Sequence, residues 1–304
     1  MRVAAIDIGT NSVLLLIAER GADGHVKALF ERSTITRLGE GVDRSRSLAP
    51  DAIARTLACL RRDAQVAGEF AVDGRVAVAT SAVRDACGAD AFLDAAGQVI
   101  GVRPDVIDGP TEARLTHAGA LAGLSLQGPV GVFDVGGGST EIVTEFGDRQ
   151  DVEALSLDIG AVRMTERHIV SDPPSAQELE AIRADVRLHL ARVPNSPGPV
   201  AWVGIGGTVT TLCAMELAMT RYDGARVHGY PLRASAVRDW VRKLSGMDVA
   251  ARRALPGLEP ARADVIIAGA IIVEELLGWA GVQSLTVSDR GVRWGLALRW
   301  FGTR

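Results

Sequence analysis

Two stretches of the chain place an aspartate, glycines and hydrogen-bonding side chains between two apolar runs. In the first, VAAIDIGTNSVLLLIAE at residues 3–19, these residues are Asp7, Gly9, Thr10, Asn11 and Ser12. In the second, GVFDVGGGSTEIVTEF at residues 131–146, they are Asp134, Gly136, Gly137, Gly138, Ser139, Thr140 and Glu141. A glycine inside an element costs about 0.5–1 kcal/mol against alanine, so three in succession indicate that something must approach the backbone closely.

The chemistry of these two turns favours phosphate. Backbone N–H groups left free in a tight turn form a concave anion site, and hydroxyl and amide side chains add donors. A third glycine loop, GIGGTVTTL at residues 204–212, holds Gly206 and Gly207 and runs from a predicted strand into a helix. It is a further phosphate or nucleotide candidate at a helix N-terminus. For any one loop alone, the alternative is a tight turn that needs a positive φ.

Carboxylates beside a phosphate site repel the ligand unless a cation lies between them. Asp7 and Asp134 follow their apolar runs at matching places, and Glu141 lies just past the second turn. Mg²⁺ (or Mn²⁺), held by one or two carboxylates and bridging to substrate phosphate, removes the conflict. The alternative is that Asp7 and Asp134 only accept N–H hydrogen bonds in their own turns.

Other charged residues have both a chemical and a structural interpretation. Glu112, in DGPTEARLTHAG, falls in the first turn of a predicted helix, where it either complements the helix dipole or acts as a general base toward water. Arg84 either clamps a phosphate oxygen or is an ordinary surface arginine. The stretch ERSTITRLGEGVDRSRS is a local basic cluster that either guides a polyanion or is solvated surface. Its arginines are Arg32, Arg37, Arg44 and Arg46.

Elements of both kinds must position these residues. Strands are predicted over residues 3–7, 12–19, 26–32, 74–80, 130–135, 141–146, 153–157, 200–205 and 284–288. Helices are predicted over residues 51–67, 111–124, 161–169, 175–193, 208–219, 234–245, 261–280 and 291–301, with a further helix opening at residue 81.

The order strand, Asp-x-Gly turn, strand, strand occurs in both halves of the chain. This repeat predicts two similar α/β domains, residues 1–124 and 125–304, with the last helix as a candidate to pack back on the first domain. Both glycine turns would then point into a cleft between the domains, a common location for a ligand.

Composition limits the class of protein. The 304 residues include 47% hydrophobic and 23% charged residues, with a net charge of −4, which is typical of a soluble globular protein and argues against a non-specific nucleic-acid binder. No signal sequence is apparent, and the apolar run VIIAGAIIV at 265–273 is too short to span a membrane, so we expect a cytoplasmic protein with no membrane partner. Cys59, Cys87 and Cys213 form neither a disulfide framework nor a zinc site and are expected in the core.

At these motifs the chain resembles the exopolyphosphatase and guanosine pentaphosphate phosphohydrolase (Ppx/GppA) family over essentially its whole length. Beside the two turns, the motifs in family order are TRLGEGVD, ATSAVRDA, TEARL, LDIGAVRMTERH, GIGGTVTTL, RADVIIAGAIIVEELL and VSDRGVRWGLAL. The resemblance implies two actin-like (ribonuclease H-like) domains of the actin, hexokinase and chaperone ATPase superfold. By motif position, Glu112 matches the catalytic glutamate. The residues that match phosphate and metal ligands are Asp134, Gly136, Gly137, Ser139 and Glu141.

The activity implied by the resemblance is hydrolysis of the terminal phosphoryl group of inorganic polyphosphate. The alternative substrate is guanosine pentaphosphate (pppGpp), which would connect the protein to the stringent response. A kinase of the same fold and a non-catalytic sensor are two further interpretations. The oligomeric state stays open, with a homodimer as one option.

The chain departs from the family pattern in two ways. Thr111 stands where the family commonly has a second glutamate, which removes a charge that would raise the pKa of its neighbour. The chain also stops after the actin-like core, without the C-terminal HD-type helical domain of longer members. We therefore expect a preference for short polyphosphate chains.

Overall fold

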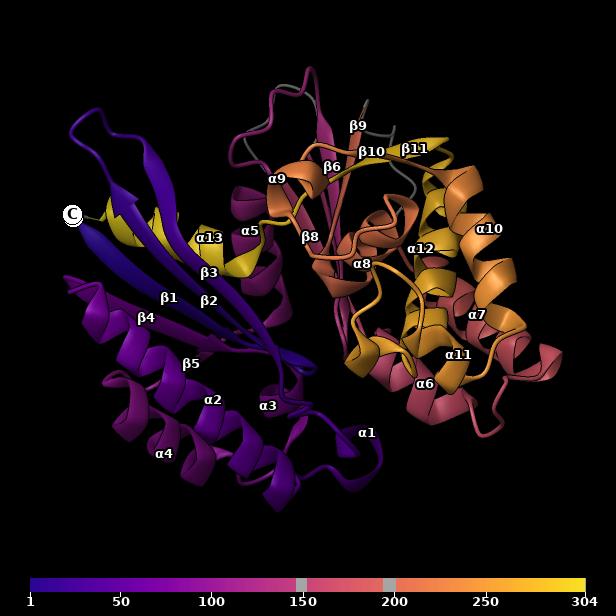
Figure 1. The fold of residues 1–304 in the computed structure, drawn as a ribbon, viewed down its shortest axis with the longest axis horizontal. Coiled ribbons are helices and arrows are strands. Elements are labelled where there is room, and N and C mark those ends of the chain that lie inside the picture. Colours follow the sequence, from indigo (N-terminus) through magenta and orange to yellow (C-terminus); the bar gives the residue numbers. More distant parts are fainter. Residues whose placement is uncertain (146–151, 194–200, 304) are drawn as a thin grey trace. The chain divides into compact units, whose positions relative to one another are not determined.

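The structure, a computed structural model, describes residues 1–145, 152–193 and 201–303 (Figure 1). The chain divides into two compact units. Unit 1 comprises Met1–Ala122 and Gly291–Arg304, and unit 2 comprises Gly123–Arg290. The last helix, α13 (Val292–Gly302), thus belongs to unit 1, and the division falls beside the boundary that the sequence places at 124–125. Residue 146, the last of the strand predicted over 141–146, and residue 200, the first of the strand predicted over 200–205, lie outside the described residues.

Unit 1 is built on a five-stranded sheet in the order β3-β2-β1-β4-β5. Its strands are β1 (Arg2–Ile8), β2 (Ser12–Arg20), β3 (Val26–Ile35), β4 (Gly74–Ala79) and β5 (Asp105–Val106). The first three strands pair antiparallel, and β4 and β5 continue the sheet in parallel. Its other helices are α1 (Val42–Ser45), α2 (Pro50–Glu69), α3 (Ser81–Asp85), α4 (Asp90–Ile100) and α5 (Gly109–Ala120).

Both faces of this sheet are covered, and alternate residues of β1 supply the two cores. Ala4 and Ile6 are buried in the cluster that includes residues of α2 and α4. Val3 and Ala5 point to the opposite face, where they pack in the cluster that includes residues of α5 and α13. This period of two in a strand with no polar face explains why residues 3–6 are all apolar.

Unit 2 repeats the arrangement with one additional edge strand, in the order β10-β11-β9-β6-β7-β8. Its strands are β6 (Val130–Val135), β7 (Thr140–Glu145), β8 (Val152–Leu157), β9 (Ala201–Ile205), β10 (Pro231–Arg233) and β11 (Ser284–Val287). The antiparallel β6-β7-β8 meander corresponds to β1-β2-β3, and β9 pairs in parallel with β6 as β4 does with β1. Two sheets of this kind confirm the expected actin-like fold class.

Helices of varied length accompany the sheet of unit 2. In the described residues they are α6 (Ala161–His168), α7 (Ala176–Leu190), α8 (Gly206–Glu216), α9 (Gly224–Val227), α10 (Ala234–Ser245), α11 (Val249–Arg253), the 3₁₀ turn η1 (Pro260–Arg262) and α12 (Ile266–Ala280). The apolar α12 is buried over most of its length. Nowhere in the described part of the chain is a helix long and apolar enough to cross a bilayer.

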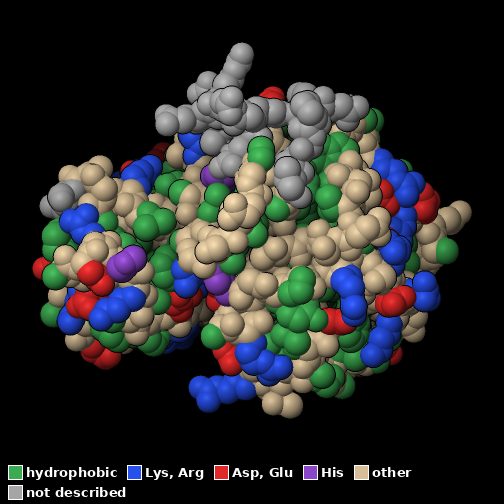
Figure 2. Space-filling view, turned by 90° about the horizontal axis from the view of Figure 1, so that it is seen from above, with side chains coloured by type: hydrophobic (Ala, Val, Ile, Leu, Met, Phe, Trp, Pro, Cys, Tyr) green, Lys and Arg blue, Asp and Glu red, His purple; other side chains and the backbone are tan. Residues whose placement is uncertain are grey.

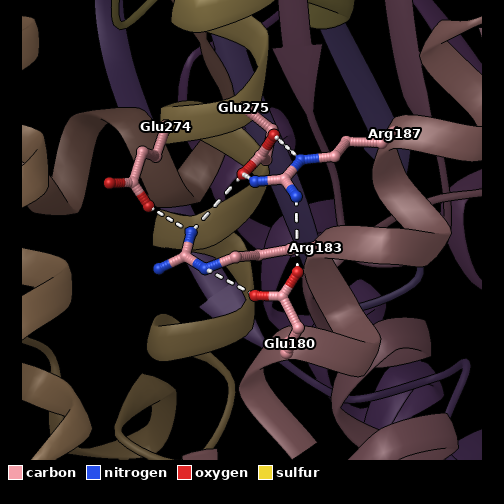
Figure 3. A network of polar contacts seen from close by, with 5 residues as sticks. All are labelled: Glu180, Arg183, Arg187, Glu274 and Glu275. Atoms are coloured by element: carbon pink, nitrogen blue, oxygen red, sulfur yellow. Dashed lines mark hydrogen bonds and ion pairs between the residues drawn. The ribbon is translucent and has the colours of Figure 1, made fainter. Parts of the chain in front are cut away.

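A network of ion pairs joins α7 to α12 (Figure 3). Arg183 contacts Glu274 and lies 3.5 Å from Glu275. Arg187 contacts Glu275 at 2.7 Å and Glu180 at 3.3 Å. Arg183, Glu274 and Glu275 are only partly exposed, and charges linked in a network contribute more to stability than an isolated surface pair does.

Several expectations are corrected by the structure. Helix α4, over 90–100, is not predicted from the sequence, and the helix expected from 261 begins at Ile266. The helix expected over 111–124 starts at Gly109 and ends at Ala120. Cys59 and Cys213 are buried as expected, but Cys87 is exposed, so its assignment to the core is wrong.

Candidate functional site

The turn between β1 and β2 presents unused backbone donors in unit 1. Gly9 N–H donates to the carbonyl of Ser12 at 3.0 Å and closes the turn. The carbonyl of Thr10 accepts from Gly39 N–H at 2.8 Å, and that of Asn11 accepts from residues 36 and 37 at 3.0 Å. Within the described residues, the N–H groups of Thr10 and Asn11 have no acceptor. The carbonyls of the turn therefore accept hydrogen bonds from a neighbouring segment, and two N–H donors remain for a ligand.

The turn between β6 and β7 repeats this device in unit 2. Gly136 N–H donates to the carbonyl of Ser139, again at 3.0 Å. Among the residues that the structure describes, the N–H groups of Gly137, Gly138 and Ser139 have no acceptor. Thr140 differs from the prediction, because its hydroxyl donates to the carbonyl of Ile159 at 2.7 Å and is buried. The hydroxyl proton of Thr140 is therefore used in a hydrogen bond within the protein and not in one to phosphate.

The start of α6 fixes the carbonyls of the second turn. Ala161 N–H donates to Gly136 O at 2.9 Å, and Val162 N–H donates to Gly137 O at 2.8 Å. The buried Arg163 donates through Nε to Gly138 O at 2.6 Å. Arg163 was not predicted as a site residue. It holds the turn from behind, and with these carbonyls engaged the turn can present only its N–H groups.

Two glycines outside the turns permit this close approach. A Cβ on Gly160 would collide with the carbonyl of Gly137, and a Cβ on Gly39 would collide with the side chain of Thr10. Each glycine therefore lets the anchoring segment lie directly against its turn.

Asp134 and Glu141 form a carboxylate pair in unit 2. They are directly opposite in the β6–β7 ladder, so their side chains lie on the same face of the sheet. Glu141 is almost completely buried and accepts a hydrogen bond from Ser156 Oγ at 2.8 Å. Like charges directly opposite each other on a sheet are destabilising. In unit 1 the equivalent position opposite Asp7 is Leu14, so Asp7 lacks a carboxylate across the ladder.

The residues of this pair fit a divalent cation that takes oxygen ligands. Mg²⁺ commonly takes one or two protein carboxylates and completes its octahedron with waters and substrate phosphates. The described residues contain no group of three or more His, Cys, Asp or Glu side chains that could hold a metal by themselves. The arrangement therefore suits an ion that binds together with phosphate better than a closed structural metal site.

The third glycine loop lies at the start of α8, beside Asp134. Gly206 has φ +91°, and a Cβ there would approach Asp134 Oδ1 to less than 3.0 Å. A Cβ on Gly207 would collide with the guanidinium of Arg262, the last residue of η1. Burial lowers the pKa of Arg262 below its ordinary value. Arg262 was also missed by sequence reasoning, because nothing in its spacing indicates that η1 aims it at the α8 N-terminus.

Glu112 lies in the first turn of α5, as predicted. Asp108 caps this helix by accepting from Thr111 N–H at 2.8 Å. The Glu112 carboxylate is 9% exposed and accepts from Arg84 Nη1 at 3.0 Å. Burial raises its pKa, while the charge and hydrogen bond of Arg84 and a hydrogen bond from Thr80 oppose the rise. A carboxylate of raised pKa is better suited to accept a proton than an exposed one.

The Arg84 side chain is held in place by hydrogen bonds but does not use all of its N–H donors. Its Nη1 also donates to the carbonyl of Ile107 at 2.9 Å. Its remaining N–H groups have no acceptor within the described residues, and the side chain is 25% exposed. Arg84 can therefore orient Glu112 and still offer donors to a phosphate oxygen. Unit 1 thus brings together Glu112 and Arg84, and unit 2 brings together Asp134, Glu141 and Gly206.

Comparison with known proteins gives consistent matches over the whole chain. A model of the Ppx/GppA phosphatase family matches residues 16–304. Exopolyphosphatase 2 of Mycobacterium tuberculosis is 42% identical over 99% of this chain and 99% of its own length. Two solved structures are also similar. An exopolyphosphatase-like protein is 33% identical with a TM-score of 0.93, covering 100% of this chain and 99% of its own. A Ppx/GppA family member from Aquifex aeolicus is 35% identical with a TM-score of 0.84, covering 100% and 98%.

Proposed function

Because this chain belongs to the Ppx/GppA phosphatase family, we propose that it is an exopolyphosphatase, which hydrolyses the terminal phosphoryl group of inorganic polyphosphate. The observation that carries the proposal is the pair of turns whose carbonyls accept hydrogen bonds from neighbouring segments. Several of their N–H groups lack acceptors within the described residues, namely those of Thr10, Asn11, Gly137, Gly138 and Ser139. Such preorganised donors bind phosphate oxygens and stabilise the charge that develops on them in phosphoryl transfer. The name of the mycobacterial relative supports polyphosphate as the substrate.

We assign phosphate binding to the glycine turn of each unit. In unit 1 the donors are the N–H groups of Thr10 and Asn11, with Arg84 as a further donor. In unit 2 the donors are the N–H groups of Gly137, Gly138 and Ser139, and Arg262 at the α8 N-terminus adds positive charge.

Asp134 and Glu141 would hold a divalent cation, for which Mg²⁺ or Mn²⁺ is the best candidate. When bound, the ion supplies charge neutralisation on the phosphate oxygens. Membership of a phosphatase family and the facing carboxylates of β6 and β7 support this assignment.

Glu112 is the proposed general base. Its ionised form accepts a proton from the attacking water, and Arg84 and Thr80 keep its carboxylate in one orientation. The proton ends on Glu112 Oε, the new P–O bond forms to the water oxygen, and the bond to the bridging oxygen breaks. Orthophosphate and a polyphosphate shortened by one unit leave.

The proposal is tested by measuring orthophosphate release from purified protein with Mg²⁺ and, separately, short polyphosphate, pppGpp or ATP. We expect the highest kcat/KM with polyphosphate and competitive inhibition of pppGpp turnover by polyphosphate. A higher kcat/KM for pppGpp would reassign the substrate. Transfer of label from ATP to an acceptor would indicate a kinase, and tight binding without turnover would indicate a sensor.

A further inference from the structure

One basic feature of unit 1 has no part in the proposed reaction. The basic segment, residues 36–47, follows β3 and includes α1, with Arg44 and Arg46 both exposed. Basic and acidic side chains are interspersed on the face of the molecule seen in Figure 2. Contacts therefore decide, residue by residue, which arginines are committed to acidic partners.

The N-terminal end of the basic segment is hydrogen-bonded to the turn between β1 and β2. The N–H groups of Thr36 and Arg37 donate to the carbonyl of Asn11, and Gly39 N–H donates to the carbonyl of Thr10. Gly39 is also too close to Thr10 and Ala82 to carry a side chain without displacement. The segment therefore begins in contact with the turn that presents N–H groups to phosphate.

The C-terminal end of the basic segment is hydrogen-bonded to the residues that follow α3, the helix of Arg84. Cys87 N–H, two residues after the end of α3, donates to the carbonyl of Arg46 at 2.8 Å. Helix α1 of the segment packs on α3, which carries Arg84 (Figure 1). The basic segment thus runs from the glycine turn to the helix that orients Glu112.

The arginines of the predicted basic cluster do not have equal roles. Arg32 is partly exposed and is paired with the buried Asp63 of unit 1. The side chains of Arg44 and Arg46 have no hydrogen-bond or ion-pair partner among the described residues. Of the acidic residues of the segment, Glu40 pairs with Arg55 at 2.8 Å, and Asp43 also takes part in a polar or electrostatic interaction.

The backbone of the segment adds a second observation. Arg46 has φ +54°, in the left-handed region that favours glycine or asparagine. A strained conformation that holds a charged, exposed side chain is a reason to look for a function at that position.

We propose that Arg44 and Arg46 form a distal subsite that binds polyphosphate units behind the terminal ones, a proposal that rests on the function proposed above. Guanidinium groups bind phosphate oxygens through paired N–H donors, and they keep their charge at all physiological pH values. A chain long enough to reach the subsite binds more tightly than a shorter one, contrary to the preference for short chains expected from the sequence. The gain is lost as salt screens the contact. A very short chain never reaches it.

The test compares two chain lengths in the Arg44→Ala/Arg46→Ala double variant. With the longer polyphosphate, we expect KM to rise by about tenfold while kcat holds, because two charge-assisted phosphate contacts are lost. With tripolyphosphate, both constants should stay within about twofold of wild type. The salt dependence of KM for the longer chain should also become shallower. Arg61→Ala/Arg238→Ala removes the same charge from two exposed positions outside the segment and should change neither substrate's constants.

An equal rise in KM for both chain lengths, or no rise for either, would overturn the distal subsite and leave the proposed activity standing. Absence of phosphate release from any polyphosphate by the wild type would instead refute the proposed activity. In that case the subsite is tested by equilibrium binding of long polyphosphate. The proposal requires the double variant to bind it more weakly than both the wild type and the control variant.

Discussion

At the scale of single residues, the environment of Glu112 separates its two interpretations. A glutamate that only complements a helix dipole is normally exposed, whereas this one is buried and held by Arg84 and Thr80. Both roles were open from the sequence, because the first-turn position satisfies either of them. Burial and the arginine partner favour the base, since neither is needed for a dipole contact at the surface.

The first prediction concerns the pH dependence of Arg84→Met. The base must be ionised, so the rate rises as pH passes through the pKa of Glu112. Arg84 favours the ionised form, and its removal should raise that pKa further and move the acidic limb of the kcat–pH profile to higher pH. Arg114→Met, which replaces an exposed arginine on the helix of Glu112, should leave the limb in place. A limb that stays or moves to lower pH in Arg84→Met would refute the coupling.

The second prediction concerns the carboxylate pair. In Glu141→Gln, the Mg²⁺ concentration for half-maximal activity should rise at least about tenfold, because a proposed ligand is lost. In chelator its Tm should equal or exceed that of wild type, since the charge opposite Asp134 is gone. Mg²⁺ should raise the Tm of wild type more than that of the variant. Glu153→Gln, on the neighbouring strand β8, is the control. Full activity of wild type in EDTA would contradict the metal assignment.

At the scale of elements, the anchoring of each turn matters as much as its own sequence. The turn residues could be predicted from glycine and hydroxyl content, but their anchors could not. Arg163 and Gly160 are distant from Gly136–Ser139 in sequence, and only the packing of α6 against the turn brings them together. Arg262 was missed for a similar reason, because a continuous helix was predicted where η1 turns separately from α12.

The third prediction tests this anchoring with two glycine substitutions in unit 2. Gly160 has extended backbone that any residue adopts, so only space prevents a side chain there. Gly160→Ala should displace the turn, lower stability by about 1–3 kcal/mol and reduce kcat/KM by roughly 100-fold. The matched variant Gly278→Ala places its Cβ in open space on α12, and it should raise stability by up to about 1 kcal/mol with unchanged activity. Full activity of Gly160→Ala would show that the turn does not depend on this contact.

One element was missed although its signal was present. Phe92, Leu93, Ala96 and Ile100 lie on one face of α4 and are buried in the core of unit 1. Their spacing is helical, but the run is short and lies among polar and glycine residues that resemble a loop. Element type was predictable where the periodic pattern was long, and less so where packing against α2 determined it.

At the scale of the whole molecule, the repeat was the most informative feature of the sequence. Two Asp-x-Gly turns at equivalent places predicted two similar sheets, and the strand orders of the two units confirm it. The last helix, a candidate from the sequence to pack back on the first domain, does belong to unit 1. In α13, Trp294, Leu296 and Phe301 pack on the β1 face that carries Val3 and Ala5.

The fourth prediction follows from this discontinuous unit. Deleting Gly291–Arg304 removes one side of a core that contains Val3, Ala5 and Leu16, so amide exchange should accelerate in β1, β2 and α5. Exchange in β6, β7 and β9 should stay close to that of the full chain, because the described core cluster of unit 2 contains no residue of α13. Equal acceleration in both units would contradict the division.

The central claim, that Glu112 is the base of a polyphosphate hydrolase, is tested most directly by the kcat of Glu112→Gln. Glutamine keeps the size and most hydrogen bonding of glutamate but cannot take a proton from water. We expect kcat to fall at least about 100-fold. Polyphosphate binding should stay the same or become tighter, because a negative charge has left the site. The Tm should fall by no more than the loss of a favourable helix-dipole interaction would cause. Asp51→Asn removes an exposed first-turn carboxylate from α2 and should remain fully active. A Glu112→Gln protein that retained more than about a tenth of the wild-type kcat would contradict the base assignment.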